Sequence, residues 1–382
     1  MSLKIGLVGC GNISSIYLDN AALFRDIAFT ACADMDAAAA ERQARRFAID
    51  ARPVNALLRS DDVDIVLNLT IPEAHAEVSL AAIEAGKHVY TEKPLATTFP
   101  DGFAVVAAAN AIGLRVGAAP DTVLGASARE ARALIDSGAV GRPLTGLAAV
   151  LGHGMEHWHP NPGFFFRPGG GPVFDMGPYY LTTLVTLLGP VASVQAVGQI
   201  GFADRTVTTP GSAMLGRTIR VETLTSVQGL LEFSSGAQVT FLASWDVWRH
   251  GVPPIELHGE TGSLQLPDPN WFGGDLKIAR GREDWQIIET QGRTFGAANW
   301  PRQKPKQANY RGLGLAEMAR GILDRRPHRA NGEIGLHVLA VMAGLLTAAT
   351  ERRPVTIEQT CERPAPLDEV EAAGLLSRCP CR

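Results

Sequence analysis

A lysine followed by a proline, in the run Glu92-Lys93-Pro94, stands directly after a short apolar segment that predicts a β-strand over residues 88–90. Proline fixes its own backbone angle and restricts the residue before it, so the ammonium group of Lys93 is directed at a fixed point. A fixed ammonium at the end of a strand can bind a hydroxyl group or exchange a proton with it. A solvated surface lysine is an equally good interpretation of Lys93 taken alone.

Asp175 and Tyr179 form a second candidate pair, in a segment over residues 169–180 that is rich in glycine and proline. They are four positions apart in the sequence, so their side chains share one face if a helix begins at this point. A carboxylate and a phenol on one face could orient a hydroxyl group and accept its proton. Helix capping by Asp175 and burial of Tyr179 as a core aromatic side chain are the alternatives.

A glycine turn over residues 9–14 lies between the first apolar segment and the first helical pattern. Such a turn lets backbone N–H groups approach a pyrophosphate at the N-terminus of a helix. Ser14 stands where a third glycine is usual, and it is small enough for close packing of helix against strand. The residues that we expect to contact a dinucleotide here are Gly9, Gly11, Asn12 and Ile13.

Asp34 ends the second apolar segment, at the place where a carboxylate accepts hydrogen bonds from the adenosine ribose. Its charge would repel a ribose phosphate, and the next residue is Met35 instead of an arginine. The sequence therefore predicts NAD as the cofactor and disfavours NADP. Further cofactor contacts are expected at the same sheet edge, with a core or capping role as an alternative for the histidine: Thr70, His75, Glu92 and Lys93.

Three more polar residues are candidates for substrate binding. His157 and His159 belong to a histidine-dense run over residues 153–160 and could donate hydrogen bonds from the rim of a site, although a structural loop is an equal alternative. On an extended segment they would face opposite ways, so they do not indicate a metal site. Asp121 follows a predicted strand and could contact substrate or nicotinamide, with helix capping as the alternative.

The first third of the chain alternates short apolar segments with helical patterns, as parallel strands joined by crossover helices require. Such an α/β sheet is doubly wound and binds ligands where its strands point their carboxyl ends. The predicted strands cover residues 4–8, 27–33, 64–69, 88–90 and 114–117, and the predicted helices cover residues 13–23, 37–47, 75–85 and 102–112.

After about residue 120 the pattern changes to alternating strands, which predict an α+β domain on a large, mostly antiparallel open sheet. Two late helices are expected over residues 310–323 and 332–350, and the tail from residue 362 is expected to be irregular. The predicted strands cover residues 144–151, 191–200, 219–233, 238–245, 255–258 and 263–266.

Composition points to a small polar substrate. The 382 residues carry a formal net charge of −4 with no long basic run, so we expect neither a nucleic-acid nor a membrane partner. No secretion leader is recognised at the first residues, and the five cysteines form no disulfide pattern, so a cytoplasmic protein is expected. Cys379 and Cys381 lack neighbouring ligands, so no metal is predicted.

The glycine turn, the Glu-Lys-Pro run and segment 169–180 together resemble the glucose-fructose oxidoreductase and inositol dehydrogenase (Gfo/Idh/MocA) family, over nearly the whole chain. The resemblance implies a Rossmann NAD-binding domain over residues 1–122 and a substrate-binding and oligomerisation domain over residues 123–382. In that family the lysine of the Glu-Lys-Pro motif, here Lys93, is catalytic and binds substrate, and the peptide bond before its proline is often cis.

The second signature of the family is Asp-x-Gly-x-His, and it matches Asp175, Gly177 and Tyr179. Tyrosine in the histidine position is similar to the glucose-fructose oxidoreductase-like members. We expect burial and a nearby positive nicotinamide ring to lower the pKa of Lys93. Either Lys93 or Tyr179 could then accept the proton, with Asp175 orienting them.

The resemblance implies an NAD-dependent dehydrogenase that oxidises a secondary or hemiacetal hydroxyl of a sugar, inositol or related polyol. A lyase or glycoside hydrolase that recycles a tightly held NAD is an alternative, and so is a non-catalytic dinucleotide-binding sensor. Family members are commonly dimers or tetramers, and an open sheet face suits self-association, so a homodimer or homotetramer is expected.

Overall fold

The computed structural model describes residues 2–377 and is built on two large sheets. In this described range the first sheet has six parallel strands in the order β3-β2-β1-β4-β5-β6, which reverses direction beside β1 and confirms the doubly wound prediction. Its strands are β1 (Leu3–Val8), β2 (Ile27–Ala33), β3 (Asp50–Ala51), β4 (Ile65–Asn68), β5 (His88–Thr91) and β6 (Val116–Ala118).

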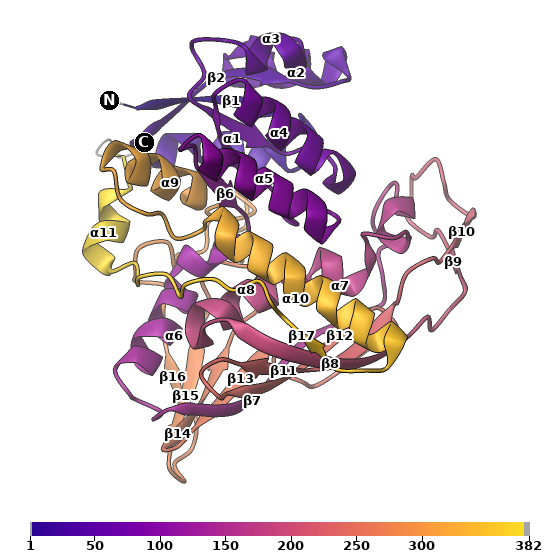
Figure 1. Cartoon of the computed structure of the whole chain (residues 1–382), viewed down its shortest axis with the longest axis vertical. Coiled ribbons are helices and arrows are strands. Elements are labelled where there is room, and N and C mark those ends of the chain that lie inside the picture. Colours follow the sequence, from indigo (N-terminus) through magenta and orange to yellow (C-terminus); the bar gives the residue numbers. More distant parts are fainter. Residues whose placement is uncertain (1, 378–382) are drawn as a thin grey trace.

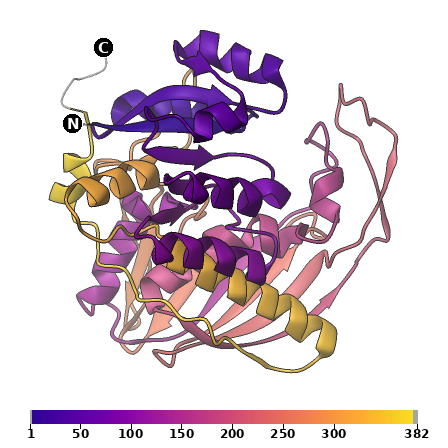
Figure 2. The same cartoon turned by 45° about the horizontal axis from the view of Figure 1, so that its top comes forward.

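Helices cover this first sheet, and Figure 2 shows them around its strands. Their starts follow local chemistry: Asp36 accepts a hydrogen bond from the Ala38 N–H at the start of one helix, and Thr98 accepts one from the Asp101 N–H at the start of another. The helices are α1 (Ser14–Asn20), α2 (Ala37–Phe47), α3 (Val54–Leu58), α4 (His75–Glu84) and α5 (Phe99–Ala111).

The second sheet has nine strands in the described part of the chain, in the order β16-β15-β14-β13-β7-β12-β11-β8-β17. β7 and β12 run parallel and the other neighbouring pairs are antiparallel, which confirms the predicted open sheet. The strands are β7 (Pro143–Leu151), β8 (Val191–Gln199), β11 (Ser226–Phe233), β12 (Gln238–Ser244), β13 (Ile255–Gly259), β14 (Gly262–Leu266), β15 (Leu276–Arg280), β16 (Gln286–Ile288) and β17 (Val355–Thr356).

One face of this sheet is covered by helices α6 (Ala126–Asp136), α8 (Gly177–Leu188) and α10 (Gly332–Glu351). Helix α10 is long and apolar enough to cross a bilayer by composition, but 67% of its apolar window is buried. Figures 1 and 2 show it between α5 and the strands of the second sheet. It therefore serves as the shared core helix of the two halves.

The strand predicted over residues 219–233 is wrong as a single element. The chain instead forms β10 (Thr218–Arg220), which pairs with β9 (Asp204–Thr206) in a separate hairpin, before it enters β11. The reason is a small satellite core that draws this segment away from the main sheet. That core consists of Phe166, Val207, Ile219, Val221 and Trp245.

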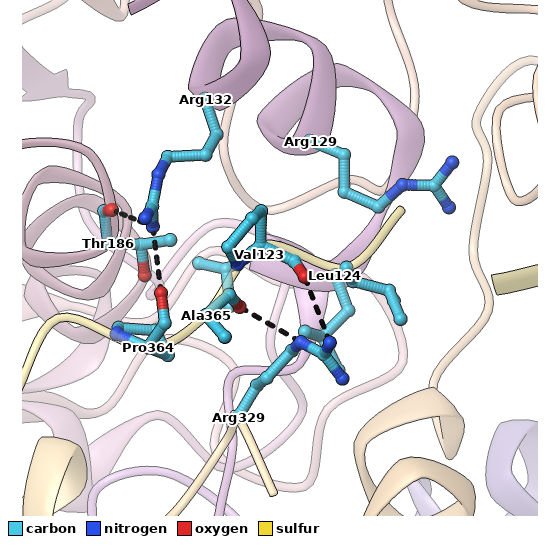
Figure 3. Close-up of a pocket in the computed structure, with 10 residues that line it drawn as sticks. Val123, Leu124, Arg129, Arg132, Thr186, Arg329, Pro364 and Ala365 are labelled. Atoms are coloured by element: carbon cyan, nitrogen blue, oxygen red, sulfur yellow. Dashed lines mark hydrogen bonds between the residues drawn. The ribbon is translucent and has the colours of Figure 1, made fainter. Parts of the chain in front are cut away.

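The tail beyond residue 362 is also more ordered than expected. It contains α11 (Glu369–Gly374), capped by Asp368, and then bridges Leu376 to Phe24 of the first half. Two arginines hold the segment before α11 through its backbone: Arg132 donates to the carbonyls of Thr186 and Pro364, and Arg329 donates to those of Ala365 and Pro366 (Figure 3). The prolines at positions 364 and 366 have no N–H to donate, so this segment cannot continue a helix or a sheet ladder, and the arginine side chains supply donors to its carbonyls.

Asp121 lies where the chain passes from the first sheet to the second, and it is 1% exposed. Its Oδ2 accepts hydrogen bonds of 3.0 Å from the N–H groups of Gly312 and Gly314, at the start of α9 (Leu313–Leu323). The structure thus shows the capping role for Asp121 and not the substrate contact. Burial raises its pKa from 3.8 to about 6, against the opposing effect of these N–H groups.

The turn between β1 and α1 depends on Gly9. Its φ of +100° lies in the region that favours glycine, and an added Cβ would stand 2.5 Å from the carbonyl carbon of Leu69. At Gly11, two residues later, an added Cβ would meet no atom within 4 Å. Gly9 is therefore required by the fold, whereas the open space over Gly11 is available to a ligand.

Gly9→Ala is expected to destabilise the protein by about 1–3 kcal/mol, because it combines a strained φ with a backbone clash. Thermal unfolding of the ligand-free protein measures the effect. Gly11→Ala is the matched control and should leave the melting temperature within about one degree of wild type, since a well-accommodated surface change has little effect. Equal losses in both variants would contradict this account of the turn.

Asp121→Asn is expected to stabilise the protein, and to do so more strongly at neutral pH than at pH 5. The carboxyl has a raised pKa, so the folded state binds its proton more tightly than the unfolded state, and stability falls as pH rises from 3.8 to about 6. Asparagine retains a carbonyl oxygen for the two N–H groups and does not ionise. The melting-temperature difference between variant and wild type should grow between pH 5 and pH 7.5, and a constant difference would refute the assignment.

Candidate active site

Lys93 and Asp175 join the two halves of the molecule. The Lys93 Nζ donates to the main-chain oxygen of Asp175 at 2.7 Å and to its carboxylate Oδ1 at 2.9 Å. Lys93 follows β5 at the carboxyl edge of the first sheet, and Asp175 ends α7 (Gly171–Asp175). Both side chains are 16% exposed. Lys93 Nζ also lies 5.2 Å from the ring centroid of Tyr179, so the three predicted catalytic residues converge.

The helix that was expected to carry both Asp175 and Tyr179 is broken between them. Helix α7 ends at Asp175, Met176 connects, and α8 begins at Gly177 with Pro178 in its first turn. Asp175 is therefore not an N-cap, since α8 has no side-chain cap. The break leaves the Asp175 carbonyl free of a continuing helix, and Lys93 uses it as an acceptor.

The environment of Lys93 corrects the expectation of a lowered pKa. Desolvation alone lowers it, but the nearby charges of Asp175, Tyr179 and Glu92 outweigh burial and hold the pKa of Lys93 well above its ordinary value. Lys93 is thus a protonated ammonium throughout the neutral range. The peptide bond between Lys93 and Pro94 is cis.

Arg311 is a polar neighbour of Tyr179 that no sequence pattern selects. Its Nη2 donates to the Tyr179 phenol oxygen at 3.2 Å and to Asn270 Oδ1 at 2.7 Å, and its Nη1 donates to Asn309 Oδ1 at 2.9 Å. Arg311 precedes α9 and is 132 positions from Tyr179. No spacing rule joins two such positions, and only the tertiary fold brings them together.

Glu92 faces the first helix and its own loop. Its Oε1 accepts from the Tyr17 hydroxyl at 2.8 Å, and its Oε2 accepts from the Lys93 main-chain N–H at 2.9 Å. The side chain is buried. Glu92 therefore holds the backbone of Lys93 against α1, and the direct cofactor contact expected for it stays a prediction.

His75 is buried between two loops at the carboxyl edge of the sheet. Its Nδ1 lies 2.7 Å from the Pro94 carbonyl oxygen and its Nε2 lies 3.1 Å from that of Thr70. Burial lowers the pKa of His75. His75 thus has the core position, at 1% exposure, and joins the Thr70 loop to the loop of Lys93.

Asp34 and the glycine turn are bonded to each other. The Cys10 N–H donates to Asp34 Oδ2 at 2.7 Å, and Asp36 N–H donates to Oδ1 at 2.8 Å. The carboxylate is only partly buried, so its remaining acceptor capacity faces outward at the end of β2. With Gly11, Asn12 and Ile13 exposed beside it, the residues present fit a dinucleotide with an unphosphorylated ribose.

The two histidines of the run 153–160 are separated. His157 is exposed and lines a hollow of about 700 Å³ between the β9–β10 hairpin and the end of β7. His159 packs edge-on against Phe164 and Phe165, with ring centroids 5.5 and 5.2 Å away, and its Nδ1 accepts from the Asn161 N–H. Burial lowers the pKa of His159, and the Asp175 charge opposes this effect only in part.

Within residues 2–377, no group of three or more His, Cys, Asp or Glu side chains is placed to hold a metal ion. Cys379 and Cys381 lie outside the described residues.

Known proteins resemble this chain over both halves. Residues 3–119 match the model of an oxidoreductase family with an NAD-binding Rossmann fold, and residues 128–265 match the Gfo/Idh/MocA C-terminal domain. Inositol 2-dehydrogenase 3 of Saccharopolyspora erythraea is 36% identical over 75% of this chain and 80% of its own length. Inositol 2-dehydrogenase of Salmonella typhimurium is 34% identical over 38% of this chain, and the alignment spans 44% of that protein.

Among solved structures, a levoglucosan dehydrogenase in complex with NADH superimposes with a TM-score of 0.79 at 21% identity, covering 94% of this chain and all of the other. At that identity the likeness shows the fold. The family models and the 36% identical relative carry the assignment further, because they match both halves of the sequence. This chain belongs to the Gfo/Idh/MocA family of oxidoreductases.

Proposed function

We propose that this protein is an NAD-dependent dehydrogenase that oxidises a secondary or hemiacetal hydroxyl group of a sugar, inositol or related polyol. The observation that carries the proposal is the meeting of Lys93, Asp175 and Tyr179 at the carboxyl edge of the first sheet. That edge is where a doubly wound sheet holds its ligands. The names of the relatives, inositol and levoglucosan dehydrogenases, support the substrate class.

NAD, when bound, supplies the acceptor for the hydride that leaves the substrate carbon. The exposed N–H groups of the turn at Gly11 to Ile13 would hold its pyrophosphate, and Asp34 would accept hydrogen bonds from its ribose. The negative charge of the partly buried Asp34 carboxylate would repel a phosphate on the ribose, so a phosphorylated ribose is disfavoured.

The proton of the substrate hydroxyl needs a separate acceptor. Because its pKa is held well above the ordinary value, Lys93 keeps its proton and donates a hydrogen bond to the substrate oxygen. Tyr179, in the phenolate form that a base requires, then receives the proton to become a neutral phenol as the O–H bond breaks, the carbonyl forms and the C–H electron pair leaves as hydride. Asp175 fixes the ammonium through two hydrogen bonds.

Lys93→Met and Tyr179→Phe are each expected to lower kcat by about 100-fold or more, because each removes a group that contacts the reacting oxygen. NADH absorbance measures turnover over a panel of inositols, aldoses, sugar acids and anhydrosugars, with NAD and with NADP. Binding of NADH, followed by its fluorescence, should persist in both variants.

The outcomes of this screen separate the alternatives. Conversion of a panel compound without accumulation of NADH would contradict the dehydrogenase and indicate a reaction that recycles bound NAD. Binding of NADH without conversion of any panel compound would contradict the proposed substrate class. Wild-type rates in Tyr179→Phe would show that the phenol is not the proton acceptor.

We also propose that the protein is a homo-oligomer that associates through the uncovered face of the second sheet. Val197 on β8 and Leu230 on β11 point from this face and are 63% and 52% exposed. With Leu242 they line a hollow of about 560 Å³ beside Arg352 and Arg353. The opposite face is covered by α8 and α10, so a second copy of this sheet is the partner that would bury these side chains.

Leu230→Glu is expected to shift the protein from oligomer to monomer, because it places a charge in the centre of the proposed interface. Light scattering during size-exclusion chromatography measures the mass. Ile112→Glu is the matched control: Ile112 is 59% exposed at the end of α5, and its change should leave the mass unaltered. A monomeric wild type, or an unchanged oligomer in Leu230→Glu, would exclude this interface.

A further inference from the structure

Arg311 differs from the other buried arginines in having no carboxylate partner. Arg205 pairs with Glu156 and Asp246, and Arg329 pairs with Glu317. In the described range 2–377, no ion pair involves Arg311, although it is only 7% exposed. A buried cation without a counter-ion is costly unless a negative charge forms beside it. The group that its Nη2 reaches is the Tyr179 phenol.

The guanidinium is fixed on several sides. Two neutral acceptors, Asn270 and Asn309, hold it at 2.7 and 2.9 Å. Asn309 is in turn bonded to Asn299, whose Oδ1 accepts from the Asn309 N–H at 2.7 Å. The main-chain carbonyl of Arg311 accepts from Asn20 of α1 at 3.1 Å. These contacts prevent the side chain from turning away from Tyr179.

The donor and acceptor roles in this hydrogen bond determine which way the O–H bond of Tyr179 points. Arginine has only donors, so at this contact the Tyr179 oxygen is the acceptor. The O–H bond of the phenol must therefore point away from Arg311. Lys93, whose Nζ lies 5.2 Å from the same ring, is a second cation near Tyr179. Two fixed positive charges therefore lie near the phenol of Tyr179.

We propose that Arg311 is the positioning residue of Tyr179, holding its oxygen as an acceptor, directing its proton-exchanging side at the substrate hydroxyl and stabilising the phenolate. This inference rests on the proposed role of Tyr179 as proton acceptor. In the oxidation the phenolate takes the hydroxyl proton and becomes a neutral phenol, while the hydride goes to NAD. Arg311 itself neither gains nor loses a proton, since burial lowers its pKa but the charges of Tyr179 and Glu92 more than compensate and hold it above the ordinary value.

Tyrosinate absorbance tests the charge effect without any substrate. The signal of Tyr179 is the difference between the pH titrations of wild type and Tyr179→Phe. In the Arg311→Met background, the Tyr179 signal is the difference between the titrations of Arg311→Met and Arg311→Met/Tyr179→Phe. This signal should appear at a pH about one unit or more above that of wild type, because a neighbouring cation is lost. In Arg311→Lys, the Tyr179 signal should appear at a pH between those of wild type and Arg311→Met. The other ionisable groups around Tyr179 and Arg311 are unchanged in all these variants: Lys93, Asp175, Glu92, Asp121, Asp268 and Tyr17.

A double-mutant cycle tests the catalytic effect, using the panel compound that gives the fastest NADH formation. Arg311→Met should lower kcat about 100-fold with little change in KM, as loss of a preorganised donor does. In the Tyr179→Phe background it should cause no further loss, because Arg311 acts through the phenol. Arg129→Met is the control, since Arg129 is a buried arginine that contacts Glu369 and not Tyr179.

Several results would overturn the inference. They are an unshifted tyrosinate signal in Arg311→Met, a wild-type kcat in that variant, or the same loss of kcat in both backgrounds, which would indicate a purely structural arginine. In those cases Tyr179→Phe would still be inactive and the proposed function would stand. Full activity of Tyr179→Phe would overturn this inference and the role of Tyr179 as proton acceptor, whereas the dehydrogenase activity itself would stand. If Arg311→Met does not fold, Asn270→Ala, which removes one anchor of the guanidinium, should give a smaller shift of the same sign.

Discussion

The ion pair between Lys93 and Asp175 is the contact on which the arrangement of the site depends. Removing two charges from water is unfavourable, and only good geometry compensates for it. Here one ammonium makes two hydrogen bonds to one residue, at 2.7 and 2.9 Å. The pair gives little reason to expect added stability, but it fixes the carboxyl edge of the first sheet against the helices of the second.

A layer of polar contacts behind this pair supports it from the first half of the chain. Glu92 binds the Lys93 main chain and Tyr17, and His75 binds the carbonyls of Pro94 and Thr70. These side chains contact backbone atoms of the loop that carries Lys93. They therefore constrain the path of this loop and not the Lys93 ammonium group directly. Such support is what keeps a catalytic side chain within a fraction of an ångström of its working position.

Sequence reasoning was most successful where the signals are local. The βα alternation predicted the first sheet, and the resemblance selected Lys93, Asp175 and Tyr179, because motif residues are read directly from the chain. It failed where a side chain binds distant backbone, as Asp121 does at Gly312 and Gly314. Arg311 was missed because its partner is 132 positions away. Short edge strands such as β16 carry too little pattern, since two of its three residues are exposed.

The order of the segments along the chain affects when the first half can finish folding during synthesis. Residues up to β6 form the first sheet, but α9 packs against β6 and β2, its start is held by Asp121, and Leu376 returns to bridge Phe24. The nucleotide-binding half is therefore completed by segments that follow the second sheet in the sequence. During synthesis one flank of the first sheet stays uncovered until these segments have been translated, so the first half cannot finish folding before the second half has been made.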